Sequence, residues 1–263
     1  MSEATGPFKG FKNRVALVTG GGSGIGFSTT SRLLAEGATV VVADVDPTAA
    51  DRAAELGADF LPFDVGDRDA WTAAIEEITT RHGGLDIAFL NAGIMTQPAT
   101  ERGIVRIDVA NLPLEDYQRV MSINVDGVVF GIQASLPAIS ARGGGAIVAT
   151  SSLAGLLAYP TDAVYAGTKH FVIGMVRSLA RILAKQNVTI NAICPGGVAT
   201  NIIGPPETID TMRERGVDLM DPAAIAEGVV RAITSGLSGE AWMCQAGRSP
   251  ELHAFGKVPG IGI

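Results

Sequence analysis

Cysteine, histidine and aromatic residues are scarce in this chain of 263 residues. It has two cysteines, three histidines and 5% aromatic residues. Two cysteines, Cys194 and Cys244, exclude the dense disulfide framework of small secreted domains. Neither these cysteines nor His82 and His253 stand at the spacing of metal ligands, so we expect no metal site.

Positive charge is also in short supply, and long apolar runs are missing. Lysine and arginine total 20 against 27 aspartates and glutamates, which makes the net charge −7. A nucleic-acid surface needs clustered basic residues, so that class of partner is excluded. No apolar run reaches the roughly 18 residues of a membrane-spanning helix. Residues 1–13 have no apolar signal core and are expected to be a flexible lead-in, so we expect a cytoplasmic protein.

Hydrophobic residues, at 47%, and glycine, with 33 residues, are abundant. Short apolar runs alternate with longer helical patterns, which is typical of parallel strands covered by helices on both faces. No linker or repeat divides them, so residues 14–263 are predicted to form a single doubly wound α/β domain. The predicted strands are Val15–Thr19, Thr39–Ala43, Phe60–Phe63, Ile87–Leu90, Ala146–Thr150, Thr189–Cys194 and Ala241–Gln245.

Two helix starts follow from short motifs. Asp46-Pro47 and Asp221-Pro222 each place a capping carboxylate ahead of a proline, which suits the first helical position. We therefore expect helices to begin at both places.

A glycine-rich turn follows the first predicted strand. Gly20, Gly24 and Gly26 leave backbone N–H groups uncovered at the start of a helix, where the helix dipole favours an anion such as a diphosphate. Ser23 and Ile25 fill positions between them. The spacing differs from the G-x-G-x-x-G fingerprint, and by itself such a turn could hold no ligand. Its place between the first strand and a helix favours a dinucleotide.

The second predicted strand leads into Asp44, which lies 20 positions after Gly24. A carboxylate here can accept hydrogen bonds from the ribose hydroxyls of an adenosine, and it would repel a 2′-phosphate. Ser23 offers no positive charge to offset that repulsion. The pattern predicts NAD rather than NADP as the cofactor. The alternative is that Asp44 only caps the turn into the next helix.

Tyr165 and Lys169 are four positions apart in a predicted helix, so their side chains share one face. A nearby ammonium and the positive ring of an oxidised nicotinamide would both favour the phenolate of Tyr165. The tyrosine could then take a proton from an alcohol while a hydride leaves the same carbon. Ser152 ends the segment that continues from the predicted strand Ala146–Thr150, at the edge of the sheet where ligands gather. Without Ser152, the pair could be an ordinary surface contact.

Together these motifs resemble those of the short-chain dehydrogenase/reductase family, from Arg14 to about Gln245. Each segment alone could be a simple turn or a helix interruption. Their order along the chain implies a Rossmann fold with a seven-stranded parallel sheet. It also implies a homotetramer with interfaces around Asp126–Ser140 and Tyr165–Lys185. The matching segments are Thr19-Gly20-x3-Gly24-x-Gly26, Asp64-Val65, Asn91-Ala92-Gly93, Asn124, Ser152, Tyr165-x3-Lys169 and Pro195-Gly196.

The resemblance also implies a division of roles. Tyr165 would be the acid/base, and Ser152 would hold the substrate oxygen. Lys169 would lower the pKa of Tyr165 and bind the nicotinamide ribose, while Asn124 would position a water that links Lys169 to solvent. The remaining cofactor contacts would be Asp64 and Val65 at the adenine, Asn91, Ala92 and Gly93 along the cleft, Pro195 and Gly196 beside the nicotinamide, and Val198 and Thr200 at its carboxamide.

Two stretches are expected to border the substrate, Leu153–Pro160 and Val198–Met220. The first carries no charge. A mostly apolar pocket suits a lipophilic alcohol better than a phosphorylated sugar. The apolar side chains expected from the second stretch are Ile202, Ile203, Met212 and Val217.

Within the family, the segments around Ser152, Lys169 and Asn191 are most similar to the 15-hydroxyprostaglandin dehydrogenase group, whose members oxidise hydroxylated lipids with NAD. Two features depart from the family pattern. Thr96–Asn111 looks longer than usual and could fold near the site. The carboxyl-terminal end lacks the Asp-Gly-Gly that is frequent in the family.

The sequence leaves two functions open. The first is an NAD-dependent oxidoreductase that moves a hydride between the nicotinamide and a small-molecule secondary alcohol or its ketone. The second is an NAD-binding regulatory or scaffold protein without turnover. The presence of an acid/base pair favours the first, because a sensor has no evident need for one.

Overall fold

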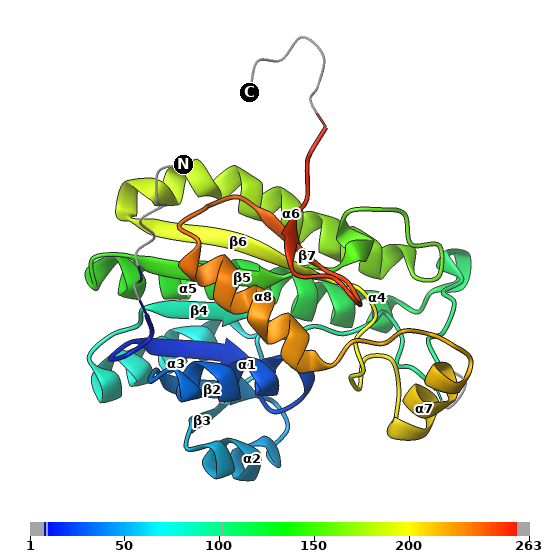
Figure 1. The fold of residues 1–263 in the computed structure, drawn as a ribbon, viewed down its shortest axis with the longest axis horizontal. Helices are drawn as coiled ribbons and strands as arrows, with labels where there is room; N and C mark the ends of the chain where they lie inside the picture. Colours follow the sequence, from blue (N-terminus) through cyan, green and yellow to red (C-terminus); the bar gives the residue numbers. More distant parts are fainter. Residues whose placement is uncertain (1–7, 9, 101–102, 257–263) are drawn as a thin grey trace.

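Buried apolar runs form one eight-stranded sheet with the order β3-β2-β1-β4-β5-β6-β7-β8 (Figure 1). The computed structural model describes Phe8, residues 10–100 and residues 103–256. Strands β1 to β7 pair in parallel, and β8 runs antiparallel to β7. The strands are β1 (Val15–Thr19), β2 (Thr39–Asp44), β3 (Asp59–Pro62), β4 (Ile87–Leu90), β5 (Gly145–Thr150), β6 (Val188–Pro195), β7 (Ala241–Cys244) and β8 (Glu251–Leu252).

The seven predicted strands are confirmed, with ends that differ by one residue or none. The expectation of seven strands, all parallel, is corrected by β8, which pairs Trp242 with Leu252 and Met243 with Glu251. A strand of two residues has no periodicity that a sequence pattern could reveal. The doubly wound α/β class is unchanged by it.

Helices cover both faces of the sheet. On one face α1 and α8 pack side by side, and α2 joins them; on the other lie α3, α5 and α6. Helix α7 lies beyond the carboxyl ends of the strands (Figure 1). The α-helices are α1 (Gly24–Ala35), α2 (Ala49–Leu56), α3 (Arg68–His82), α4 (Leu114–Met121), α5 (Gly127–Ala141), α6 (Ala163–Leu183), α7 (Pro206–Glu214) and α8 (Pro222–Thr234). Shorter turns are η1 (Val109–Asn111), η2 (Ser122–Asp126, a π-helical turn), η3 (Leu153–Gly155) and η4 (Ala184–Gln186).

One of the two predicted helix starts is confirmed. Asp221 caps α8 by accepting a hydrogen bond from Ala223 N at 2.8 Å. The other is wrong: α2 begins at Ala49, with Thr48 as its N-cap. The Asp46 carboxylate instead accepts from the N–H and hydroxyl of Thr48, so it closes a local turn ahead of the helix.

The predicted flexible lead-in, residues 1–13, falls mostly outside the described residues. Within the described part, Phe8 and Phe11 are buried in the core beneath β1 and β2. The guanidinium of Arg14 lies 4.9 Å from the ring centroid of Phe8. The Phe8 and Phe11 side chains pack on the domain, and the flexible lead-in over residues 1–13 stays a prediction.

The helical stretch Leu114–Ala141 is long and apolar enough to cross a membrane, by length and composition alone. A core helix passes the same test, and its residues Val128, Ile132 and Ile139 belong to the core between the sheet and α3. The stretch is weak support for a membrane span.

The strand order reverses between β1 and β4, which are neighbours in the sheet. The segments that follow β1, β4, β5 and β6 all leave the sheet at its carboxyl edge. In an open α/β sheet such a reversal opens a crevice that binds ligands. We therefore expect a ligand-binding site at this edge of the sheet.

Candidate active site

The glycine-rich turn connects β1 to α1. Gly20 and Gly24 have positive φ angles, 61° and 51°, which favour glycine. Gly26 is needed for another reason, because a Cβ at that position would collide with the carbonyl oxygen of Gly20. Ser23, the N-cap residue of α1, makes no side-chain capping bond. The first turn of α1 can therefore present its N–H groups to an anion.

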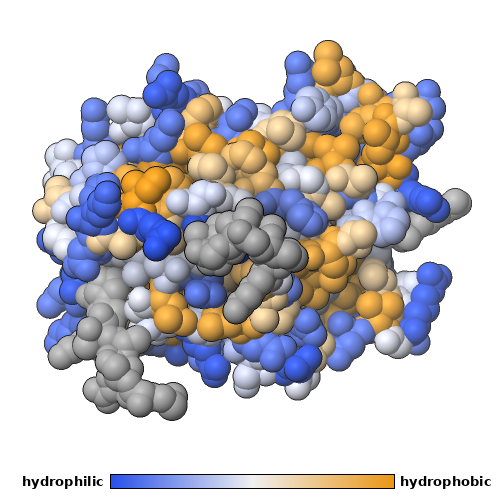
Figure 2. Space-filling model, turned by 90° about the horizontal axis from the view of Figure 1, so that it is seen from above, coloured by the Kyte–Doolittle hydropathy of each residue, from blue (hydrophilic) through white to orange (hydrophobic). Residues whose placement is uncertain are grey.

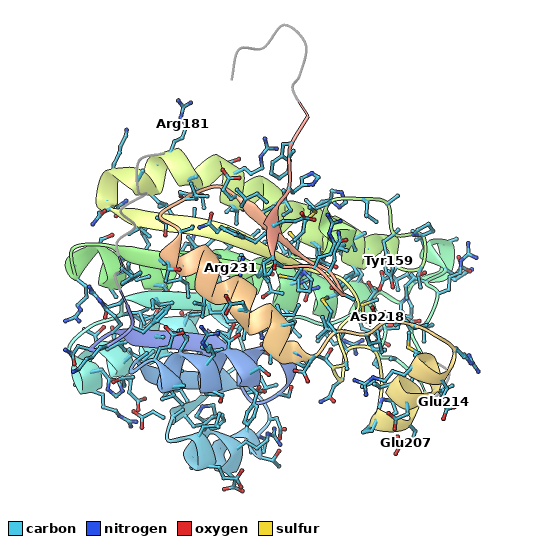
Figure 3. All side chains as sticks on the ribbon, in the orientation of Figure 1. Tyr159, Arg181, Glu207, Glu214, Asp218 and Arg231 are labelled. Atoms are coloured by element: carbon cyan, nitrogen blue, oxygen red, sulfur yellow. The ribbon has the colours of Figure 1, made fainter. Side chains whose placement is uncertain are left out.

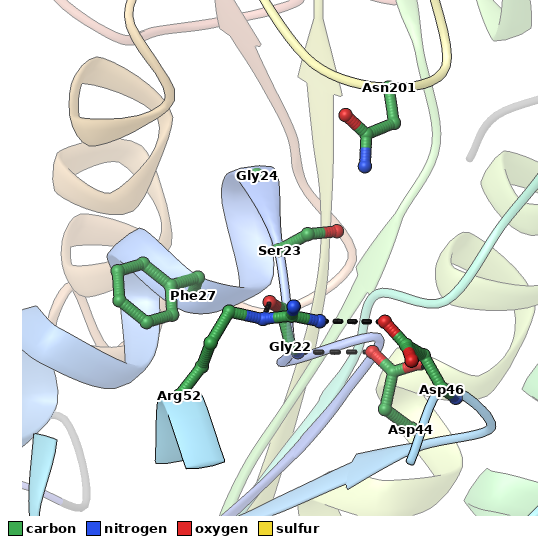
Figure 4. A pocket seen from close by; sticks show the side chains of 8 residues that line it. All are labelled: Gly22, Ser23, Gly24, Phe27, Asp44, Asp46, Arg52 and Asn201. Carbon is green, nitrogen blue, oxygen red and sulfur yellow. Dashed lines mark hydrogen bonds and ion pairs between the residues drawn. The ribbon is translucent and has the colours of Figure 1, made fainter. Parts of the chain in front are cut away.

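Asp44 stands at the end of β2, against this turn. Its carboxylate accepts hydrogen bonds from Gly22 N at 3.0 Å and from Asp46 N at 3.1 Å. Asp44 thus fixes the local turn, as the alternative interpretation held, and it also lines a cavity of about 420 Å³. Figure 4 shows Asp44 and Asp46 beside the turn, with Asn201 above them.

No sequence pattern singled out Arg52, which lies on α2 beside the same cavity. Its guanidinium donates to Gly22 O at 2.6 Å and to the Asp46 carboxylate at 2.7 Å (Figure 4). The hydrogen bond from Arg52 lowers the pKa of Asp46 to about 2. The carboxylates of Asp44 and Asp46 and the guanidinium of Arg52 therefore border this end of the site. Its net charge is negative, because there are two carboxylates and one guanidinium.

A larger cleft of about 860 Å³ continues from Asp44 across the carboxyl edge of the sheet. It brings together nearly all of the residues that the sequence predicted for the site. Gly26 and Asn124 do not line it; they support residues that do. The lining residues from the predicted set are Gly20, Ser23, Gly24, Ile25, Asp44, Asp64, Val65, Asn91, Ala92, Gly93, Ser152, Tyr165, Lys169, Pro195, Gly196, Val198 and Thr200.

Tyr165 and Ser152 meet in this cleft. Tyr165 lies in the first turn of α6 and is buried, while Ser152 follows β5. Burial raises the pKa of the Tyr165 phenol to about 12, against the opposing effect of its hydrogen bond with Ser152. The Ser152 hydroxyl also accepts a hydrogen bond from Ala154 N at 3.1 Å. A phenol and a hydroxyl so paired can hold one oxygen atom of a substrate between them.

Lys169 lies one helical turn after Tyr165, as the spacing predicted. Its Nζ donates to Thr150 O at 2.9 Å and lies 5.5 Å from the centroid of the Tyr165 ring. Burial lowers the pKa of Lys169 to about 8, so the ammonium form still predominates at pH 7. The ammonium is near the ring, but the pKa of Tyr165 is shifted by burial, by the hydrogen bond with Ser152 and by Tyr159 and Asp162, and Lys169 is not among these causes.

Asn124 occupies η2, the π-helical turn between α4 and α5, and is fully buried. Its side-chain oxygen accepts from Ile94 N at 2.9 Å, and its side-chain nitrogen donates to Ile94 O at 2.9 Å and to the Thr168 hydroxyl at 3.1 Å. A Cβ on Gly93 would press on both Lys169 Nζ and Asn124 Oδ1. Asn124 therefore fixes the segment after β4 beside Lys169, and its predicted link to a water stays a prediction.

The far end of the cleft is apolar. Ile202, Ile203, Met212 and Val217 all line it, as predicted, together with Leu153 and Leu157. Pro98 and Ile104 line it too, so these described parts of the Thr96–Asn111 segment lie beside the site. Tyr159 also lines the cleft. Figure 3 labels Tyr159, and it shows Glu207 and Glu214 on α7. Glu214 is exposed.

Cysteine and histidine take no part in the site. Cys194 is buried, and burial raises the pKa of its thiol to about 12. His82 contacts Asp59 at 2.9 Å, and His170 contacts Ala166 O at 2.9 Å. Among the described residues, no group of three His, Cys, Asp or Glu side chains could hold a metal ion.

Comparison with known proteins identifies the family. A family model described as short chain dehydrogenase matches residues 14–207. A cyclohexanol dehydrogenase of an Acinetobacter species is 35% identical over 210 residues, 77% of this chain and 80% of that protein. A trans-4-hydroxycyclohexanecarboxylate dehydrogenase of Sinomonas cyclohexanicum is 34% identical over 199 residues, 71% of this chain and 73% of that protein.

The chain is also similar to a steroid dehydrogenase and to a protein of solved structure. A 3beta-hydroxysteroid dehydrogenase of Eggerthella lenta is 33% identical over 196 residues, 72% of each chain. A solved chain from Novosphingobium aromaticivorans, assigned to the short-chain dehydrogenases, superposes with a TM-score of 0.74 at 27% identity. It covers 88% of this chain and 80% of that one.

The fold and the cleft define an oxidoreductase of the Rossmann type. The chain belongs to the short-chain dehydrogenase/reductase family, and the resemblance seen in the sequence is confirmed. The narrower likeness to the 15-hydroxyprostaglandin dehydrogenase group stays a prediction.

Proposed function

We propose that this protein moves a hydride between NAD and a lipophilic cyclic secondary alcohol or its ketone, with Tyr165 as acid/base. The observation that carries the proposal is the hydrogen-bonded pair of Tyr165 and Ser152, which lies in one cleft between Asp44 and an apolar wall. The relatives named above for cyclic alcohols and for a hydroxysteroid support this substrate class.

The residues at the polar end of the cleft fit a dinucleotide. Gly24 has a positive φ angle, and a Cβ there would lie only 2.9 Å from Thr200 Cγ2, so the turn requires glycine at this position. The uncapped start of α1 suits a diphosphate, and Asp44 suits a ribose with free hydroxyls. When bound, NAD supplies the hydride acceptor for oxidation, and NADH supplies the donor for reduction.

The chain's own residues handle the substrate oxygen and its proton. The Ser152 hydroxyl holds the oxygen, and Tyr165 takes the O–H proton in oxidation or donates it in reduction. With a pKa of about 12, the phenol of Tyr165 is protonated at pH 7, the form that ketone reduction needs. Alcohol oxidation needs the phenolate, so its rate is expected to rise with pH. Lys169, charged at pH 7, is proposed to favour the phenolate and to bind the nicotinamide ribose.

The test follows NADH absorbance with cyclohexanol, a 3β-hydroxysteroid and short-chain alcohols as substrates, and with the matching ketones in the reverse direction. Turnover of the cyclic substrates with a KM below that of the short-chain alcohols supports the proposal. A protein that binds NADH but converts none of these substrates would be the regulatory or scaffold protein considered above.

The preference for NAD over NADP has its own test. Asp44 and Asp46 together outweigh Arg52, so a 2′-phosphate would meet net negative charge at this end of the site. We expect the wild-type protein to bind NADH at least about tenfold more tightly than NADPH, which is about 1.4 kcal/mol. In Asp44→Ser the ratio of the two Kd values should fall by about tenfold, measured by calorimetric titration. Asp51→Asn, an exposed acid on α2, should leave the ratio unchanged. Tighter NADPH binding by the wild-type protein would remove Asp44 from this role.

We also expect a homotetramer and a cytoplasmic location. The outer side of α6 carries apolar residues that are only partly buried in the single chain, among them Phe171, Met175 and Leu179, and Ile182 is exposed. Figure 2 shows apolar side chains gathered on this side of the molecule. A helix face of this kind is suited to contact with another copy of the chain.

A further inference from the structure

Asp162, the residue before α6, is a fully buried acid that is not explained by the roles described so far. Its Oδ1 accepts from Tyr165 N at 2.9 Å and from the Thr96 hydroxyl at 2.7 Å, and its Oδ2 accepts from Thr96 N at 3.0 Å. The other fully buried acid among the described residues, Asp86, is paired with Arg14 and Arg142 instead. Asp162 thus joins the start of the catalytic helix to a segment 66 positions earlier in the chain.

That segment is held at both ends. Asn124 bonds to the N–H and the carbonyl of Ile94, and Asp162 bonds to the N–H and the hydroxyl of Thr96. Met95 lies between them, is 6% exposed and packs in one cluster with Tyr165, Ala154 and Ala166. The hydrogen bonds at Ile94 and Thr96 therefore hold the Met95 side chain against Tyr165.

We propose that Asp162 is a positioning residue for Tyr165, which it fixes from two sides: through the Tyr165 backbone N–H, and through Thr96 and Met95 packed against the ring. The inference rests on the proposed function of Tyr165 as acid/base. A proton donor must stay within hydrogen-bond reach of the substrate oxygen, and a shift of about 1 Å can reduce a rate about 100-fold. Asp162 holds Tyr165 in position at the start of α6.

The charge of Asp162 also acts on the phenol. After burial, the nearby groups that raise the pKa of Tyr165 are Tyr159 and Asp162, while the hydrogen bond with Ser152 lowers it. Lys169 faces the same ring at 5.5 Å. Loss of the negative charge at position 162 therefore lowers the pKa of Tyr165, so the rise of alcohol oxidation with pH moves to lower pH.

Asp162→Asn separates this role from a purely structural one. The Asn oxygen can still accept from Tyr165 N and the Thr96 hydroxyl, but its NH2 group would face the Thr96 N–H, donor against donor. We expect kcat for cyclohexanol oxidation to fall about tenfold with the Kd for NADH unchanged, because only the position of the phenol is affected. The midpoint of the pH profile of kcat should move to lower pH.

Three further variants separate the effect of position from the effect of charge. Thr96→Val removes the hydroxyl but keeps the charge of Asp162, so kcat should fall with no shift of the pH midpoint, and Thr96→Ser should restore kcat. Asp67→Asn, at the exposed N-cap of α3, makes the same change from acid to amide as Asp162→Asn. It should change neither kcat nor the pH midpoint.

The outcomes are distinct. A lower melting temperature with normal kcat and an unmoved pH midpoint in Asp162→Asn would show a structural role only and overturn the inference. If Tyr165→Phe is inactive while Asp162→Asn and Thr96→Val are normal, the proposed function stands and the inference fails. If Tyr165→Phe keeps its activity, the proposed function itself fails.

Discussion

Tyr165→Phe is expected to lower kcat for alcohol oxidation by about 10³-fold, within the range that general acid–base catalysis contributes. Phenylalanine keeps the ring that packs with Met95, Ala154 and Ala166, so the local fold should persist. It removes the hydroxyl that pairs with Ser152, and with it the only acceptor proposed for the substrate proton. NADH binding, followed by fluorescence titration, should change less than about twofold, because the lost group faces the substrate oxygen.

A matched control is available on α4. Tyr117→Phe removes the same hydroxyl from an exposed tyrosine outside the cleft and should leave kcat unchanged. A kcat for Tyr165→Phe close to the wild-type value would mean that another group carries the proton, and the assignment of Tyr165 would be withdrawn. A loss of NADH binding in parallel with kcat would point to a collapse of the cleft instead.

Gly26→Ala is expected to lower kcat/KM for NAD by about 100-fold. The added methyl group cannot fit against the carbonyl oxygen of Gly20, so α1 must move away from β1. That movement displaces the helix start proposed to bind the diphosphate, and a displacement of about 1 Å can cost about 100-fold in rate. Overpacking at a buried contact should also destabilise the fold by about 1–3 kcal/mol.

Gly174→Ala provides the comparison, since nothing lies within 4 Å of a Cβ at that position of α6. Alanine is the better helix former, so this variant should gain about 0.5–1 kcal/mol in the free energy of unfolding. Denaturant titration of both variants gives the stabilities, and NADH production gives kcat/KM. A normal kcat/KM for NAD in Gly26→Ala would show that the turn does not place the cofactor. A loss of stability in Gly174→Ala would mean that the added methyl group meets another copy of the chain, which is the contact proposed above for this side of α6.

The strands were predictable because each is a short buried run with its own local signal. Val15–Thr19 and Ile87–Leu90 are confirmed with the same ends. The Asp46-Pro47 motif misled because a capping carboxylate and a proline define a turn as well as a helix start, and here Thr48 follows and takes up the Asp46 side chain. Asp221-Pro222 carries the same signal without that competitor, and its helix begins where predicted.

The residues placed in the cleft were predictable from spacing along single elements and from family motifs. The residues that were missed act across elements. Arg52 reaches back from α2 to Gly22, and Thr96 reaches forward to Asp162. A signal for Asp162 was available, since an aspartate three positions before Tyr165 suits the N-cap of an apolar helix. No comparable signal marked Thr96 or Arg52.

The sequence alone determined the alternation of strands and helices, the glycine-rich turn and the four-residue spacing of Tyr165 and Lys169, because these depend on neighbours a few positions apart. Only the tertiary structure decided the edge strand β8, the pairing of Arg52 with Asp46 beside the glycine-rich turn and the link from Asp162 to Thr96. Such contacts depend on how whole helices and strands pack against one another. Many sequences with the same local pattern would pack with different contacts between these elements.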